Sequence, residues 1–296
     1  MRTKIFQGMF VAMGVAILAA ASLCGAQEME SHIGSLTGHS NDGKKLYKRY
    51  CFYCHGQYGD GAGENAAWIE PKPRDFTAAT FKCRSTTTGF LPTDEDLYKS
   101  IARGFSNSNM PQWAPLSNQN RADLVAYIKT FSPRWKTEKP VEVLVVPPEP
   151  PINIESISHG HELFEKLECW KCHGQEGRGD GPSASTLTDS KDQPIRPYNF
   201  AGGANDSRFK CGSENADIYK IFMTGVDGTP MPSFADVIKP NDAWDLVHFL
   251  RTLQVNRKSK ENEVLKAAGG KLLPEKPAPP APEAPAAPDA KTPGSR

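Results

Sequence analysis

The sequence has almost no net charge. Lysine and arginine number 35 and aspartate and glutamate 34 in a chain of 296 residues, so the formal net charge is +1. A chain without a cationic excess lacks the electrostatic footprint of nucleic-acid-binding proteins, and nucleic acid is not an expected partner. The sequence also lacks paired carboxylates, an activated nucleophile and a phosphate-binding loop as motifs. No motif of these kinds therefore indicates catalysis or a small-molecule substrate.

Cysteine is scarce, but four of the seven cysteines form one motif twice. Residues 51–55 are CFYCH and residues 169–173 are CWKCH. The pattern Cys-x-x-Cys-His is the attachment site of a c-type haem. Two thiols one helical turn apart can each add to a vinyl group on one porphyrin edge, and the adjacent imidazole ligates the iron. The predicted haem-binding residues are Cys51, Cys54, His55, Cys169, Cys172 and His173.

Two other interpretations of the motif fit the sequence less well. A redox-active dithiol does not require the histidine that follows the second cysteine in both copies. A zinc site needs a second pair of cysteines or histidines at similar spacing, and the sequence has no such pair nearby. The motif therefore predicts two covalently bound haem c groups, each with one iron.

The two motifs lie in two copies of one sequence unit. In each copy an amphipathic helix precedes the motif, a glycine-rich loop follows it, and two further helices come later. Shared order with nearly constant spacing indicates an internal duplication. We expect a mainly α fold with two tandem haem domains, at residues 40–135 and 158–254. The corresponding segments are 73–76 and 197–200, 81–83 and 209–211, 96–99 and 217–220, and 123–128 and 245–250.

The segments outside the two copies differ from them in composition. Residues 1–26 have a basic start, an apolar run and small residues, which predicts a secretory signal peptide; an uncleaved membrane anchor is the alternative. Residues 27–39 are small and polar and are expected to be a flexible lead-in. Prolines make residues 136–157 a semi-rigid linker. Residues 255–296 become rich in proline and alanine and are expected to be disordered.

A six-coordinate haem iron needs a second ligand opposite each histidine. Met110 is the only methionine between residues 30 and 222, so it is the predicted ligand in the first domain. In the second domain Met231 precedes a proline as Met110 does, whereas Met223 lies in a predicted helix and is expected to pack in the core. The predicted iron ligands are His55, Met110, His173 and Met231.

Bis-histidine ligation is the alternative to these methionines. The remaining histidines are His32, His39, His159, His161 and His248. None of them has a counterpart in the other copy at a position that could reach over the ring. His248 replaces an alanine of the first copy and is expected at the helix surface or at a haem edge.

A helix leading into Cys-x-x-Cys-His, a glycine-rich loop, a Met-Pro loop 55 to 58 residues later and a closing aromatic helix resemble the class I cytochrome c domain. The resemblance covers residues 40–134 and 158–253. It implies crossed N- and C-terminal helices, an exposed haem edge and one-electron transfer. It also implies haem attachment outside the cytoplasmic membrane, which agrees with export to the periplasm. The helix crossings would pack Tyr47 with Tyr127 and Phe164 with Phe249.

The resemblance implies a periplasmic diheme cytochrome c that shuttles single electrons between respiratory redox partner proteins. A membrane respiratory complex could be such a partner, and a haem-bearing subunit of such a complex is an alternative function. A diheme peroxidase is another alternative. That enzyme needs an iron with an open or displaceable site, and a Met-Pro loop in both copies argues against it.

Two further features separate the copies from a minimal haem domain. Cys83 and Cys211 occupy equivalent positions, either as small buried side chains with the same local role or as a disulfide between the domains. The copies also differ in charge, because residues 40–135 carry a net +4 and residues 158–254 a net −4. Oppositely charged faces would attract each other or steer different partners.

Overall fold

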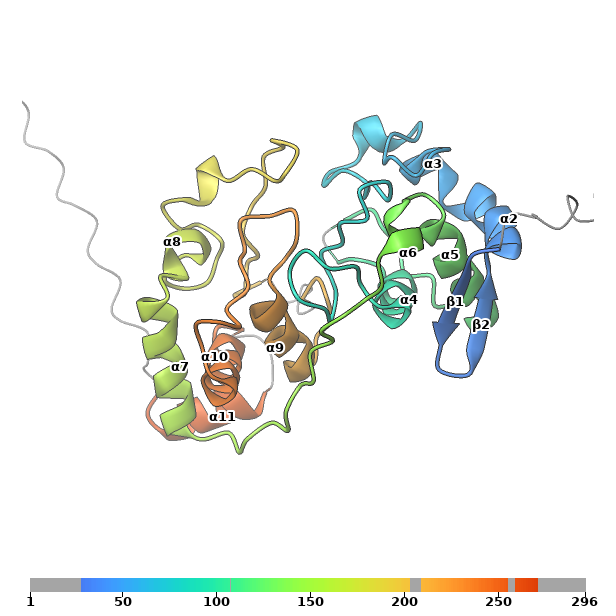
Figure 1. Cartoon of the computed structure of the whole chain (residues 1–296). Helices are drawn as coiled ribbons and strands as arrows, with labels where there is room; N and C mark the ends of the chain where they lie inside the picture. The colour runs from blue at the N-terminus through green and yellow to red at the C-terminus, as the bar shows by residue number, and fades with distance from the viewer. Residues whose placement is uncertain (1–27, 107, 203–208, 255–258, 271–296) are drawn as a thin grey trace, which may run out of the picture.

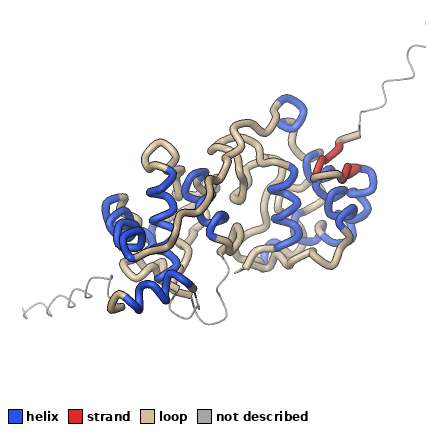
Figure 2. The backbone as a smooth tube through the Cα atoms, turned by 90° about the horizontal axis from the view of Figure 1, so that it is seen from below, coloured by secondary structure: helices blue, strands red, loops and turns tan. Residues whose placement is uncertain are grey.

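The computed structural model describes residues 28–106, 108–202, 209–254 and 259–270. The predicted signal peptide at residues 1–26 lies outside this part of the chain. Two helical domains lie side by side (Figure 1). Loops occupy much of the centre between their two groups of helices (Figure 2). Within the described ranges, no helix has both the length and the apolar character needed to cross a membrane.

The first domain is built on two crossing helices, α2 (Ser40–Tyr50) and α5 (Asn118–Lys129). A third helix, α4 (Asp94–Arg103), starts at a capping box, in which the Thr93 hydroxyl accepts a hydrogen bond from the Asp96 backbone N–H. Such a box satisfies backbone groups that a helix start otherwise leaves unpaired. The short elements of this domain are α3 (Phe52–His55), the 3-10 turn η1 (Ala66–Trp68) and α6 (Arg134–Thr137).

The second domain repeats this plan. Helix α7 (Ile154–Lys166) crosses α10 (Pro240–Thr252), and α9 (Asn215–Thr224) corresponds to α4. An additional helix, α11 (Lys260–Ala267), contacts both α7 and α10. The predicted mainly α fold with two tandem domains is therefore confirmed. The short elements of this domain are α8 (Trp170–His173) and the 3-10 turn η2 (Ala184–Thr186).

Each pair of crossing helices meets at a glycine. A Cβ atom added at Gly43 would lie 2.0 Å from the carbonyl oxygen of Asp123. One added at Gly160 would lie 2.0 Å from that of Asp245. Only a residue without a side chain lets the two backbones come this close. Near each contact, aromatic rings pack across the crossing as predicted. The ring centroids are 5.2 Å apart for Tyr47 and Tyr127 and 5.4 Å apart for Phe164 and Phe249.

The prediction of a flexible lead-in at residues 27–39 is wrong for most of that segment. Strands β1 (Glu30–Ile33) and β2 (Leu36–His39) form an antiparallel hairpin that packs on α5. Ser31 is buried there, and its hydroxyl donates to the Ala122 carbonyl oxygen at 2.7 Å. The segment is ordered by contacts with a helix distant in sequence, because its own residues are too polar to form a core.

The predicted linker at residues 136–157 is mostly extended, but helix α7 begins inside it. Asn153 caps this helix by accepting a hydrogen bond from the Ser156 backbone N–H at 2.8 Å. Earlier in the linker, Leu144 packs against the core of the second domain. The backbone N–H of Leu144 donates to the Ser85 carbonyl oxygen of the first domain at 2.7 Å. The linker is therefore held against both domains.

The prediction of a disordered tail at residues 255–296 is wrong for its described part, residues 259–270. Helix α11 lies there, and the Ser259 hydroxyl caps it. Glu261 on α11 is buried and accepts a hydrogen bond from the Asn215 side chain at 3.1 Å. The rest of the predicted tail lies outside the described residues.

A disulfide joins the two domains. Cys83 and Cys211 are bonded, with their Cα atoms 5.3 Å apart, which decides between the two interpretations of these cysteines. Beside the disulfide, Arg84 Nη2 lies 2.8 Å from Asp227 Oδ1, and the Arg84 side chain is 0% exposed. Arg84 also donates to the carbonyl oxygen of Thr224, the last residue of α9. A cation at a helix C-terminus complements the helix dipole, so this contact stabilises the domain interface electrostatically.

Candidate functional site

The first Cys-x-x-Cys-His motif continues directly from helix α2. The Cys51 N–H donates to the Tyr47 carbonyl oxygen at 2.9 Å, and the His55 N–H donates to the Cys51 carbonyl oxygen at 2.9 Å. In the second motif the His173 N–H donates to the Cys169 carbonyl oxygen at 2.9 Å. Each motif is therefore a single helical turn that carries both thiols and the imidazole.

A backbone carbonyl orients the imidazole of each motif. His55 Nδ1 lies 3.0 Å from the Arg74 carbonyl oxygen. His173 Nδ1 lies 3.0 Å from the Tyr198 carbonyl oxygen. A carbonyl oxygen can only accept, so Nδ1 carries the proton and Nε2 keeps its lone pair for a metal. Burial lowers the pKa of both imidazoles, which favours the neutral form that ligates iron.

An aromatic ring also packs flat against each imidazole. The centroids of His55 and Phe76 are 4.5 Å apart at 20° between the planes, and those of His173 and Phe200 are 4.5 Å apart at 24°. The alignment of the two copies within the sequence places Phe76 and Phe200 at equivalent positions but assigns them no role. Their equivalent positions in the duplication are the signal that could have identified them, because a ring that orients a ligand is needed once in each copy.

A cavity in the first domain brings the predicted residues together. Cys51, Cys54, His55 and Met110 all line it. The cavity is open on one side, and its wall combines the two motif thiols with the His55 imidazole and the Met110 thioether. Two thiols, an imidazole and a thioether in a largely apolar wall fit a covalently attached haem. The apolar lining includes Phe76, Phe81, Leu97, Leu124 and Ile128.

All four motif cysteines are free thiols. Burial raises the pKa of Cys51 and of Cys169 to about 12, so these two are protonated at neutral pH. Neither motif is closed by an internal disulfide. All four sulfur atoms can therefore form the thioether bonds that the motif predicts.

The two predicted methionine ligands lie in loops of the same geometry. In each loop the methionine carbonyl oxygen accepts from the backbone N–H five residues earlier, and its N–H donates to a hydroxyl two residues earlier. Met110 lines the cavity of the first domain, and Met231 packs against the core of the second. The distances are 3.1 Å for Phe105 N to Met110 O, 3.2 Å for Met110 N to Ser108 Oγ, 3.0 Å for Val226 N to Met231 O and 3.2 Å for Met231 N to Thr229 Oγ1.

The remaining histidines have other partners. His248 is 0% exposed, so the prediction of a place at the helix surface or a haem edge is wrong. Its Nδ1 lies 2.9 Å from Ser156 Oγ, and its Nε2 lies 3.2 Å from Glu149 Oε1. His248 therefore ties α10 to α7 and to the linker. His32 and His39 belong to the hairpin, and neither they nor His248 line the described cavity.

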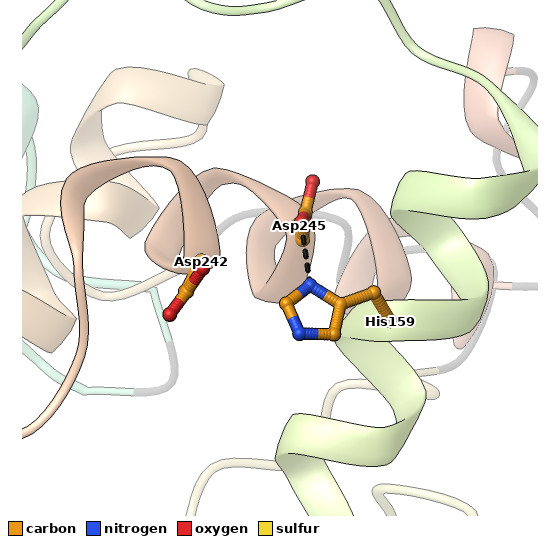
Figure 3. A group of neighbouring side chains, drawn as sticks. All are labelled: His159, Asp242 and Asp245. Atoms are coloured by element: carbon orange, nitrogen blue, oxygen red, sulfur yellow. Dashed lines mark hydrogen bonds and ion pairs between the residues drawn. The ribbon is translucent and has the colours of Figure 1, made fainter.

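One histidine lies in a group that could in principle hold a metal ion. His159, Asp242 and Asp245 place donor atoms within 4.8 Å of one another where α7 passes α10 (Figure 3). His159 Nδ1 already lies 2.8 Å from Asp245 Oδ2. Asp242 lies in the first turn of α10, where a carboxylate is favoured by the helix dipole. The hydrogen bond and the helix start account for this group without a metal.

Comparison with known proteins supports the two-domain division. Residues 157–254 match the family model described as Cytochrome c, and residues 39–128 match the model described as Cytochrome C oxidase, cbb3-type, subunit III. A chain in the solved structure of a reducing HAO-like protein complex from Kuenenia stuttgartiensis is 43% identical, with a TM-score of 0.69. The similarity covers 72% of this chain and 95% of that one. No curated protein matches the chain.

Each copy of the duplication thus has its own family match, and each contains one complete Cys-x-x-Cys-His motif. Two such domains imply two covalently attached haem c groups with iron, as predicted. The related chain from Kuenenia stuttgartiensis is similar over nearly its whole length. The chain belongs to the c-type cytochromes with two haem domains.

Proposed function

We propose that this protein carries single electrons between redox partner proteins. Haem iron supplies one-electron oxidation and reduction when it is bound in such a domain. The observation that carries the proposal is that His55 and Met110 line the same cavity, although they are far apart in sequence. If His55 and Met110 both hold the iron, the bound haem would exchange electrons and would leave no position open for a substrate.

The proposed ligand pairs are His55 with Met110 and His173 with Met231. The oriented imidazoles and the matching methionine loops support both pairs. A neutral thioether stabilises ferrous iron relative to ferric iron and so raises the reduction potential. The peroxidase alternative needs an open iron, which neither loop favours. Sustained turnover of hydrogen peroxide by the purified protein would favour the peroxidase instead.

Met110→Ala and Met231→Ala test the ligands separately. A ferric haem with a methionine ligand has a long-wavelength sulfur-to-iron absorption band, and each substitution should remove the share of that band contributed by one haem. Met223→Leu is the matched control, because Met223 is buried in the second-domain core and should leave the band unchanged. A full-strength band in either alanine variant would exclude that methionine as a ligand.

We also propose that one redox partner is an HAO-like protein. The support is the similarity to a chain of a complex that contains such a protein. A membrane respiratory complex is the alternative partner. An HAO-like protein purified from the organism that encodes this cytochrome should co-elute with the cytochrome in size-exclusion chromatography. It should also exchange electrons with the haems of the cytochrome in a stopped-flow experiment. Absence of both effects would leave the membrane complex as the partner to test.

The proposed location is the periplasm, after export by residues 1–26. The interdomain disulfide supports export, because disulfides persist in oxidising compartments. An intact mass of the natural protein tests whether the segment is removed. A mature chain starting at Gln27 is expected, whereas a chain that retains the segment and fractionates with membranes would indicate the anchor.

A further inference from the structure

Two lysines from different domains line the first-domain cavity. Lys82 precedes Cys83 in the first domain, and Lys210 precedes Cys211 in the second; both line the cavity that contains the first haem motif. Each is partly buried. Within the described ranges neither ammonium has a hydrogen bond or an ion pair with a carboxylate.

The surroundings of these lysines are cationic. Burial, followed by the charges of Lys210 and Arg74, lowers the pKa of Lys82 to about 8. Burial also lowers the pKa of Lys210, with Arg74 again contributing. The carboxylate of Asp189 opposes this effect at Lys82 without cancelling it. Asp75 is occupied, since it accepts from Lys191 at 2.7 Å.

Partly buried cations to which no described carboxylate is hydrogen-bonded or ion-paired indicate an anion that belongs beside them, because desolvated charges in folded proteins are normally paired. A c-type haem has two carboxylates on the porphyrin edge opposite the vinyl groups that bond to cysteine. The cavity that holds Cys51 and Cys54 also holds both lysines. A haem attached in this cavity would therefore supply the anionic groups that the two lysines call for.

We infer that Lys210 of the second domain, with Lys82, binds the carboxylates of the haem attached to the first domain. This inference rests on the proposed function only in that a haem occupies the first-domain cavity. The interdomain disulfide positions the site, since the Cα atoms of Cys83 and Cys211 are 5.3 Å apart and each is adjacent to one of the two lysines. The second domain thus supplies part of the haem site of the first.

A cation beside the haem carboxylates opposes removal of an electron from the iron, because oxidation adds positive charge to the group. Lys210→Gln should therefore lower the midpoint potential of the first-domain haem in a potentiometric titration of the full-length, haem-loaded protein. The Met110→Ala variant identifies which step of the titration belongs to that haem. Lys210→Arg keeps the charge and should restore most of the potential. Lys82→Gln should lower the same step.

Lys191→Gln is the matched control. Lys191 is also a second-domain lysine that reaches the first domain, at 2.7 Å from Asp75, but it does not line the cavity. It should leave the first-domain step unchanged. The inference would be overturned if the wild type, Lys210→Gln and Lys82→Gln had the same midpoint potential for the first-domain haem. It would also be overturned if Lys210→Gln and Lys191→Gln shifted that potential equally. Such results would leave the carrier function intact, because that function fails only if the wild type lacks reversible one-electron steps.

Discussion

Arg84 forms a buried ion pair across the contact between the two domains. Its side chain is 0% exposed, and its partner Asp227 is 11% exposed. The same guanidinium donates to the Thr224 carbonyl oxygen and to the Thr88 hydroxyl. A buried charge pair with these additional hydrogen bonds is satisfied only when both domains are docked.

Arg84→Met should lower the free energy of unfolding by about 3–5 kcal/mol, because it leaves the Asp227 carboxylate buried without its cation. Urea unfolding of the haem-loaded protein measures this loss. Lys99→Met is the control, since Lys99 pairs with Glu95 on the exposed face of α4 at 3.5 Å. That change should cost less than about 1 kcal/mol. Similar losses in the two variants would mean that Arg84 contributes no more than a surface ion pair.

At the scale of single residues, the sequence predicts the chemistry and misses the contacts between distant segments. The haem-binding cysteines and histidines follow from one motif whose spacing is set by the porphyrin. The role of Lys210 does not follow, because it acts on a cavity of the other domain. The sequence also predicts the wrong environment for His248, because its partner Glu149 comes from the linker. Local patterns contain no information on such partners.

At the scale of elements, the crossing of α2 and α5 depends on one missing side chain. Gly43→Ala would place a Cβ atom 2.0 Å from the Asp123 carbonyl oxygen. Alanine gains roughly 1 kcal/mol in helix propensity over glycine. Overpacking costs about 1–3 kcal/mol or more, so the clash should prevail and lower the free energy of unfolding.

Chemical denaturation of the haem-loaded protein, followed by circular dichroism, tests this expectation. Lys44→Ala is the matched control, because Lys44 is the next residue of α2 and is exposed. It should change the unfolding free energy by only a few tenths of a kcal/mol. A Gly43→Ala protein as stable as this control would show that the two helices can separate without cost.

Helices are the elements that the sequence predicts best here. Periodic apolar residues and acidic first turns mark α4, and a capping box sets its start. The hairpin of β1 and β2 is missed because its strands are only four residues long and mostly polar. Its order comes from contacts with α5, such as the bond from Ser31 to the Ala122 carbonyl oxygen. Helix α11 is also missed, because it is held by a contact with a segment distant in sequence. Its buried Glu261 accepts a hydrogen bond from the Asn215 side chain of α9.

At the scale of the whole molecule, the disulfide between Cys83 and Cys211 limits how far the domains can separate. Peptide mapping under non-reducing conditions should recover the two cysteines in one linked peptide pair. Cys83→Ser with Cys211→Ser should lower the unfolding free energy by up to about 4–5 kcal/mol in the chain-entropy model, because the bond closes a long loop. Recovery of both cysteines as free thiols from the folded wild type would contradict the structure.

The opposite net charges of the domains explain their docking only in part. Arg84 of the cationic domain meets Asp227 of the anionic one, as expected from the charges. Lys191 and Asp75 form the reverse pair, with the cation from the anionic domain. Net charge therefore predicts attraction between the domains, whereas individual side chains decide where they meet. The duplication was visible in sequence, but the relative placement of its copies was not.

The disulfide also imposes an order on the maturation of the chain. Cys83 is synthesised 128 residues before its partner Cys211, and the second haem motif lies between them. During that interval Cys83 is an unpaired thiol close in sequence to Cys51 and Cys54. Cys169 and Cys172 of the second motif are also synthesised before Cys211. Haem attachment at both motifs would remove all four competing thiols and leave Cys83 with Cys211. Haem supply would thus act as a control on disulfide fidelity.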